Sequence, residues 1–169
     1  MKPKLITGVG LAVLICLGST AWGQDAASKK FLQKAIEGNM AEIQMGQLAQ
    51  QKGKSDEVRS FGQTLEKDHS DSNQKALEAA SSMGVTPPSG PNSEQKAQYN
   101  RLSKLSGEKF DAELAKHMVL DHKKDIKEYE RAAKKNDNAG TYAKDALPTL
   151  HKHLDMAQSL SGGSAMGRR

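Results

Sequence analysis

Cysteine and aromatic residues are scarce in this 169-residue sequence, which contains one Cys, one Trp, three Phe and three Tyr. The single cysteine, Cys16, lies in an apolar N-terminal segment, so no disulfide can form in the rest of the chain. A nucleic-acid-binding surface would combine clustered basic residues with aromatic side chains, whereas here Lys and Glu alternate. The composition therefore argues against nucleic-acid binding. Stability must come from a hydrophobic core, which a single domain of this length can provide.

The chain also lacks an apolar run long enough to cross a membrane. Its longest apolar stretch extends from Leu5 to about Gly18, which is shorter than the roughly 20 residues that a bilayer-spanning helix needs. Lys2 and Lys4 precede this stretch and small residues follow it, so residues 1–23 are predicted to be a cleaved secretory signal peptide. We therefore expect a periplasmic or secreted protein without a stable membrane anchor. Residues 24–160 would form one domain, and the Gly- and Ser-rich residues 161–169 a disordered tail.

Apolar residues recur at three- and four-residue spacing, and alternation typical of strands is absent, so an all-α fold is predicted. Ser55 is a suitable N-cap for the second helix, and Pro148 predicts a kink or a break in the last one. The expected long helices span about 26–52, 55–83, 108–135 and 138–160, and a shorter helix spans about 93–105.

The lengths of the connections predict how these helices are arranged. Residues 53–54 and the turn at 136–140 are short enough to make antiparallel hairpins. Between the hairpins lie roughly two dozen residues, which begin with a non-helical segment containing Pro87, Pro88 and Pro91. A crossover of this length makes the second and third long helices parallel. The arrangement is that of a ferritin-like four-helix bundle with a short crossover helix between helices 2 and 3.

Each of the four long helices carries acidic or imidazole groups on its apolar stripe. At a common rise per residue, counting along the helices places four of these side chains at one height in the bundle. Buried polar groups left unpaired cost about 1–3 kcal/mol each, so the groups of this layer must bind one another, water or a ligand. The four residues are Glu42, His69, His122 and His153.

Three imidazoles and a carboxylate form a plausible first coordination shell, so Glu42, His69, His122 and His153 are candidate metal ligands. Asp68 and Asp121 are candidates for further ligands or for acceptors that orient the imidazoles. The cofactor is unknown from these residues alone, but one zinc, iron or copper ion would suit nitrogen and oxygen donors. The alternative is a hydrogen-bonded network that only fixes helix register. A ferritin-type di-iron site would need two Glu-x-x-His motifs, and only Glu66 to His69 matches.

The sequence has no nucleophile elbow, and no cysteine follows the predicted signal peptide, so nothing indicates covalent catalysis. These absences favour a non-enzymatic role. The leading hypothesis is an exported metal-binding bundle, with a stress-related role as one form of it. A structural or interaction module, which would act through self-association or an unknown protein partner, is the second hypothesis. An iron- or copper-dependent redox protein is the third.

The order and spacing of several motifs resemble the bacterial Domain of Unknown Function family 4142 over about Ser28 to Leu160. The motifs that carry the resemblance are Gly38-Asn39-Met40-Ala41-Glu42-Ile43, Val58-Arg59-Ser60-Phe61, Asp68-His69, Gly107-Glu108-Lys109-Phe110-Asp111, Met118-Val119-Leu120-Asp121-His122 and residues 147–154, LPTLHKHL. The resemblance implies an exported, ferritin-like helical protein with no established reaction. The positions that the family shares correspond in this sequence to Glu42, Asp68, His69, Asp121, His122, Pro148 and His153.

Overall fold

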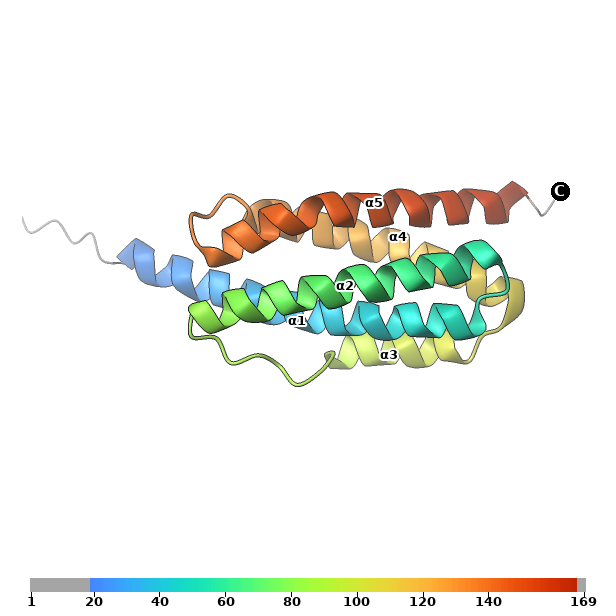
Figure 1. The fold of residues 1–169 in the computed structure, drawn as a ribbon, viewed down its shortest axis with the longest axis horizontal. Coiled ribbons are helices and arrows are strands. Elements are labelled where there is room, and N and C mark those ends of the chain that lie inside the picture. The colour runs from blue at the N-terminus through green and yellow to red at the C-terminus, as the bar shows by residue number, and fades with distance from the viewer. Residues whose placement is uncertain (1–18, 167–169) are drawn as a thin grey trace, which may run out of the picture.

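The computed structural model describes residues 19–166, and within them the chain forms five α-helices and no strand. The prediction of an all-α fold is therefore confirmed. Residues 1–18, which hold most of the predicted signal peptide, lie outside the described part. The helices are α1 (Ser19–Lys52), α2 (Asp56–Ser82), α3 (Ser93–Ser103), α4 (Gly107–Ala132) and α5 (Asn138–Met166), as shown in Figure 1.

Two helices are longer than the sequence pattern predicts. α1 begins at Ser19, inside the predicted signal peptide, and α5 continues to Met166, beyond the predicted end near Leu160. α5 also passes through Pro148 without the break that was one of the two expected outcomes. Pro148 is the only proline in these two helices, so it is the only position in them that lacks a backbone N–H. Residues 167–169 of the predicted tail lie outside the described part.

α1 and α2 form an antiparallel hairpin with closely packed backbones. A Cβ atom added to Gly46 would lie 2.7 Å from the carbonyl oxygen of Gly62, and one added to Gly62 would lie 2.6 Å from that of Gly46. Only glycine allows the two helices to approach this closely. Ser55 caps α2 as predicted, because its side chain accepts a hydrogen bond from the backbone N–H of Val58 at 3.3 Å.

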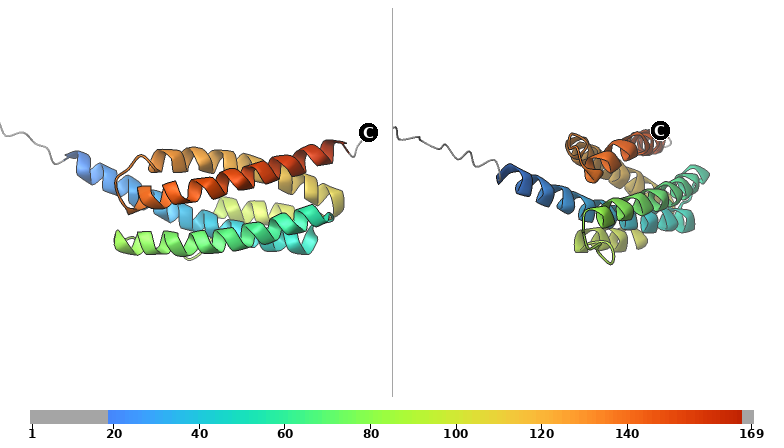
Figure 2. Two further views of the ribbon diagram at one scale, coloured as in Figure 1. Left: turned by 45° about the horizontal axis from the view of Figure 1, so that its top comes forward. Right: turned by 60° about the vertical axis from the view of Figure 1, so that its left-hand side comes forward.

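The connection between α2 and α4 returns along the length of the molecule, so α2 and α4 point in the same direction (Figure 1). α3 lies in this connection and packs against α1, while α4 and α5 form the second hairpin and α2 packs on α5 (Figure 2). The Asp111 carboxylate at the start of α4 accepts hydrogen bonds from the backbone N–H groups of Lys54 and Ser55, both at 2.9 Å. The two hairpins are thereby joined at one end.

The buried apolar residues form two clusters that a layer of polar residues separates. In α1, Leu32 and Ile36 belong to one cluster and Met45 and Leu48 to the other, and buried Glu42 stands between them. In the other long helices one histidine likewise stands between residues of the two clusters, namely His69 in α2, His122 in α4 and His153 in α5.

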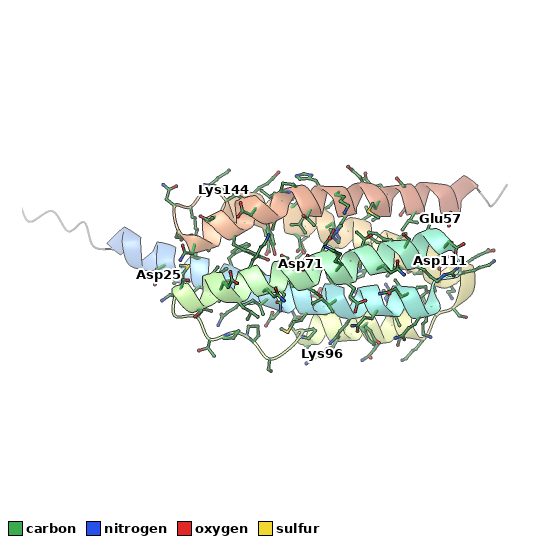
Figure 3. All side chains as sticks on the ribbon, viewed as in Figure 1. Asp25, Glu57, Asp71, Lys96, Asp111 and Lys144 are labelled. Carbon is green, nitrogen blue, oxygen red and sulfur yellow. The ribbon has the colours of Figure 1, made fainter. Side chains whose placement is uncertain are left out.

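Charged side chains cover the outside of the molecule. Examples are Asp71 on α2, Lys96 on α3 and Lys144 on α5, all of which are exposed (Figure 3). No helix of the described residues has both the length and the apolar character needed to span a membrane.

Candidate metal centre

Three buried imidazoles converge in the polar layer, one each from α2, α4 and α5. His69, His122 and His153 are 5%, 1% and 0% exposed. Each offers one ring nitrogen that lies within 4.8 Å of the nitrogens offered by the other two, and among the described residues no other set of three His, Cys, Asp or Glu does so. His122 Nε2 and His153 Nδ1 lie 3.4 Å apart.

Two of the rings are held from outside by acceptors that determine which nitrogen carries the proton. His122 Nδ1 lies 3.1 Å from the carbonyl oxygen of Met118, one turn earlier in α4, and His153 Nε2 lies 3.0 Å from Asp68 Oδ2. A carbonyl and a carboxylate can only accept, so both ring nitrogens must donate. In the neutral rings, His122 Nε2 and His153 Nδ1 therefore carry lone pairs, and these are the two atoms that face each other.

The third ring is held through α1. His69 Nδ1 lies 3.0 Å from Asn39 Oδ1, and the Asn39 Nδ2 group donates to the Tyr142 hydroxyl at 3.0 Å. Tyr142 in turn contacts the hydroxyls of Ser72 at 2.9 Å and Tyr129 at 3.2 Å. Since the Asn39 amide nitrogen donates to Tyr142, the amide oxygen is the atom that faces His69. An amide oxygen can only accept, so His69 Nδ1 donates to it. The remaining nitrogen, Nε2, is buried and has no hydrogen-bond partner.

The electrostatics of the centre favour neutral imidazoles. Burial and the two neighbouring rings lower the pKa of His69 well below its usual value. Burial and His153 lower the pKa of His122 to about 4, and burial also lowers the pKa of His153. Burial opposes ionisation of Asp68, but hydrogen bonds from His153 and Lys152 bring its pKa below the usual value. At neutral pH the centre therefore presents unprotonated ring nitrogens, as metal ligation requires.

Glu42, the fourth predicted ligand, lies in the same layer but is not among the converging atoms. It is 3% exposed, its Oε2 atom has no hydrogen-bond partner, and its carboxyl group lies against Asp121 of α4. Burial, followed by the charges of Asp121 and Asp125, raises the pKa of Glu42 well above its usual value. Burial and Asp121 raise the pKa of Asp125 to about 7. The structure thus divides the predicted layer into an imidazole side and a carboxylate side.

A pocket of about 390 Å³ opens beside the centre, between α1, α3 and α4. His69 and Glu42 both line it, as do Asp121 and Asp125. One ring of the imidazole centre, His69, therefore borders a cavity that acidic side chains line. A ligand that enters by this route meets carboxylates and a histidine ring.

Of the predicted outer residues, Asp68 supports the imidazole centre, whereas Asp121 lies on the carboxylate side. Glu66, the acid of the single Glu-x-x-His motif, instead accepts hydrogen bonds from Gln47 at 2.8 Å and Gln50 at 2.6 Å.

Asn39 and Asp125 were not singled out by the sequence analysis, although both lie at helical spacing from residues that were. Asn39 precedes Glu42 by three positions and Asp125 follows Asp121 by four. A search for polar residues repeated along each inner stripe would have found both.

A family model described as "Domain of unknown function (DUF4142)" matches residues 18–160. The chain belongs to this family, as its motifs indicated. No curated protein and no solved structure matches the chain. The family description names no activity, so the arrangement of the buried side chains is the best guide to function.

Proposed function

We propose that this protein is a non-enzymatic helical protein that binds one transition-metal ion through His69, His122 and His153. The observation that carries the proposal is the direction of the outer hydrogen bonds. Each ring uses one nitrogen to donate to a backbone or side-chain acceptor, which leaves its second nitrogen as a buried lone pair. Histidine ligands of metal sites are oriented in the same way.

The contact between two of the rings argues against a network that only fixes helix register. His122 Nε2 and His153 Nδ1 are 3.4 Å apart, and the outer acceptors leave no proton for either atom when the rings are neutral. Two lone pairs at this distance repel each other, and the unpartnered His69 Nε2 adds a third buried acceptor. A cation shared by the three nitrogens would satisfy all of them at once.

The donor set limits which metals are suitable. Three neutral imidazoles fit zinc, copper or iron better than magnesium or calcium, which prefer oxygen ligands. Bound there, the ion would act as a Lewis acid and would keep at least one position for water or another ligand. His69, His122 and His153 would hold it. Asn39, Asp68 and the Met118 carbonyl would orient the rings.

The arrangement of the helices supports a ferritin-like four-helix bundle, and we infer that the protein is exported and binds metal outside the cytoplasm. Two hairpins joined by a long crossover characterise that fold, and its metal sites are built from side chains on facing helices. The signal-like N-terminus supports a periplasmic or secreted location, where the bundle would take up metal from its surroundings.

Metal analysis of the exported protein tests the proposal. After chelation, the protein should take up about one equivalent of Zn²⁺ or Cu²⁺ by calorimetry and elemental analysis. His69→Ala combined with His122→Ala should abolish tight uptake. His151→Ala is the matched control, because His151 is exposed on α5 near the centre in sequence.

Folding is monitored by circular dichroism in every variant. Equal metal content in the wild type and the double variant would contradict the proposal. Loss of folding in the double variant, with no metal bound by the wild type, would favour the register network. Visible absorption of the copper- or iron-loaded protein under oxidising and reducing conditions would detect a redox function.

A further inference from the structure

The carboxylate side of the layer is a second group of acidic side chains, with Glu42 buried and Asp121 and Asp125 partly buried, and the imidazole centre does not use it. Glu42 on α1 faces Asp121 on α4, and both line the pocket of about 390 Å³ together with Asp125 and His117. None of the ion pairs found among the described residues includes Glu42, Asp121 or Asp125. Lys34, at the edge of the pocket, pairs with Glu128 instead, at 3.3 Å.

Glu42 presents a buried acceptor atom without a donor beside this pocket. The side chain is 3% exposed and borders the pocket, and its Oε2 atom has no hydrogen-bond donor. A buried acceptor without a donor costs about 1–3 kcal/mol, and more when it is charged. The neighbouring acid increases this cost, since two carboxylates in contact repel each other unless a proton or a cation lies between them.

We propose that the pocket binds a second cation, a partly hydrated divalent ion such as Mg²⁺ or Mn²⁺, through the carboxylates of Glu42 and Asp121. Asp125, one turn further along α4, accepts hydrogen bonds from water molecules of the ion. Oxygen ligands are the preferred donors for these cations, whereas the neighbouring imidazoles prefer zinc or copper. The two sides of the layer would thus select different metals.

A hydrated ion fits acids that do not converge on one point. The carboxylates do not form a set with all ligand atoms within 4.8 Å of one another, as the imidazoles do. Mg²⁺ characteristically keeps several water molecules and binds proteins through one or two carboxylates. The pocket has room for these waters, since one water molecule occupies about 30 Å³ in the liquid.

Binding of Mn²⁺ to the full exported protein tests this second site, with loss of the free-ion electron paramagnetic resonance signal as the readout. The protein is first saturated with Zn²⁺ to occupy the imidazole centre. About one equivalent of Mn²⁺ should then bind, and excess Mg²⁺ should displace it. Glu42→Gln should weaken Mn²⁺ binding at least tenfold. Glu128→Gln is the matched control, because Glu128 lines the same pocket but is already paired with Lys34.

The histidine variants separate this site from the imidazole centre. The double variant His69→Ala with His122→Ala should lose Zn²⁺ binding but keep Mn²⁺ binding. Mn²⁺ binding is therefore expected even if the imidazole centre proves not to bind Zn²⁺. Absence of Mn²⁺ binding in the wild type, equal binding in folded Glu42→Gln, or loss of binding in the histidine variant would overturn the second site. If Glu42→Gln does not fold, Asp121→Asn provides the same test, with circular dichroism to verify its helix content.

Discussion

The imidazole centre and the carboxylate side of the pocket lie in one layer of the molecule, but their side chains are held differently. Each imidazole has an acceptor behind it, namely Asn39, the Met118 carbonyl or Asp68. Glu42 has no donor on Oε2 and touches another acid. Outer hydrogen bonds therefore fix the orientation of the imidazoles, which is what the proposed metal site needs. Glu42 lacks such support, which agrees with the proposal that the second ion brings its own water.

The two sides also respond to pH in opposite directions. A buried histidine with a lowered pKa must gain a proton on acidification, so its contribution to stability is lost as the pH falls from about 6.5 toward the folded pKa, which is about 4 for His122. A buried acid with a raised pKa is favoured in its protonated form, so its contribution is lost as the pH rises. The two windows overlap, because the loss for a buried acid such as Asp125 develops from its ordinary pKa of 3.8 up to about 7, so the two effects oppose each other between about pH 4 and 6.5.

The largest effect is expected where outer support is removed from the imidazole centre. Asp68→Asn replaces the carboxylate behind His153 with a neutral amide and should weaken Zn²⁺ binding about 10- to 100-fold, as changes behind metal-bound histidines typically do. Competition with a chromogenic chelator measures the affinity. Asp71→Asn is the control, because Asp71 lies on the same helix and pairs only with exposed Lys67. Equal affinities in the two variants would show that Asp68 does not support the centre.

A smaller effect is expected on the carboxylate side. In the metal-free protein the pKa of Asp125 is about 7, against an ordinary value of 3.8, so Asp125 destabilises the folded state progressively as the pH rises through this window. Asp125→Asn should therefore be more stable than the wild type at pH 8, by about 1–2 kcal/mol after allowance for partial exposure. Urea unfolding with chelator at pH 5 and pH 8 measures the difference. A gap that does not grow with pH would contradict the assignment.

The smallest effect concerns the residues behind Asn39. Tyr142→Phe removes the hydroxyl that accepts from Asn39 and contacts Ser72 and Tyr129, and should cost about 1 kcal/mol of folding free energy. Zn²⁺ affinity should fall only a few-fold, because His69 keeps its direct bond to Asn39. Thermal and urea unfolding together with the zinc titration measure both changes. A larger loss of affinity than in Asp68→Asn would reverse the order of support proposed for the rings.

Much of the layer could be predicted from residue spacing. Three of its polar residues, His69, His122 and His153, converge because helices that lie side by side in a bundle share one rise per residue, and apolar residues flank each of them in both directions. Neither the part played by Asn39 nor the length of α5 followed from the pattern. Asn is common in many settings, and periodicity weakens at the ends of helices.

Helical periodicity and axial height are local properties, so the amino-acid order alone specifies five helices and the level at which their polar groups occur. The direction in which each group faces depends on how far each helix is rotated about its axis and how closely its neighbours approach. Contacts between distant segments set both quantities, as the glycine pair of α1 and α2 illustrates. For that reason only the packed molecule places Glu42 against Asp121 while the three imidazoles meet one another.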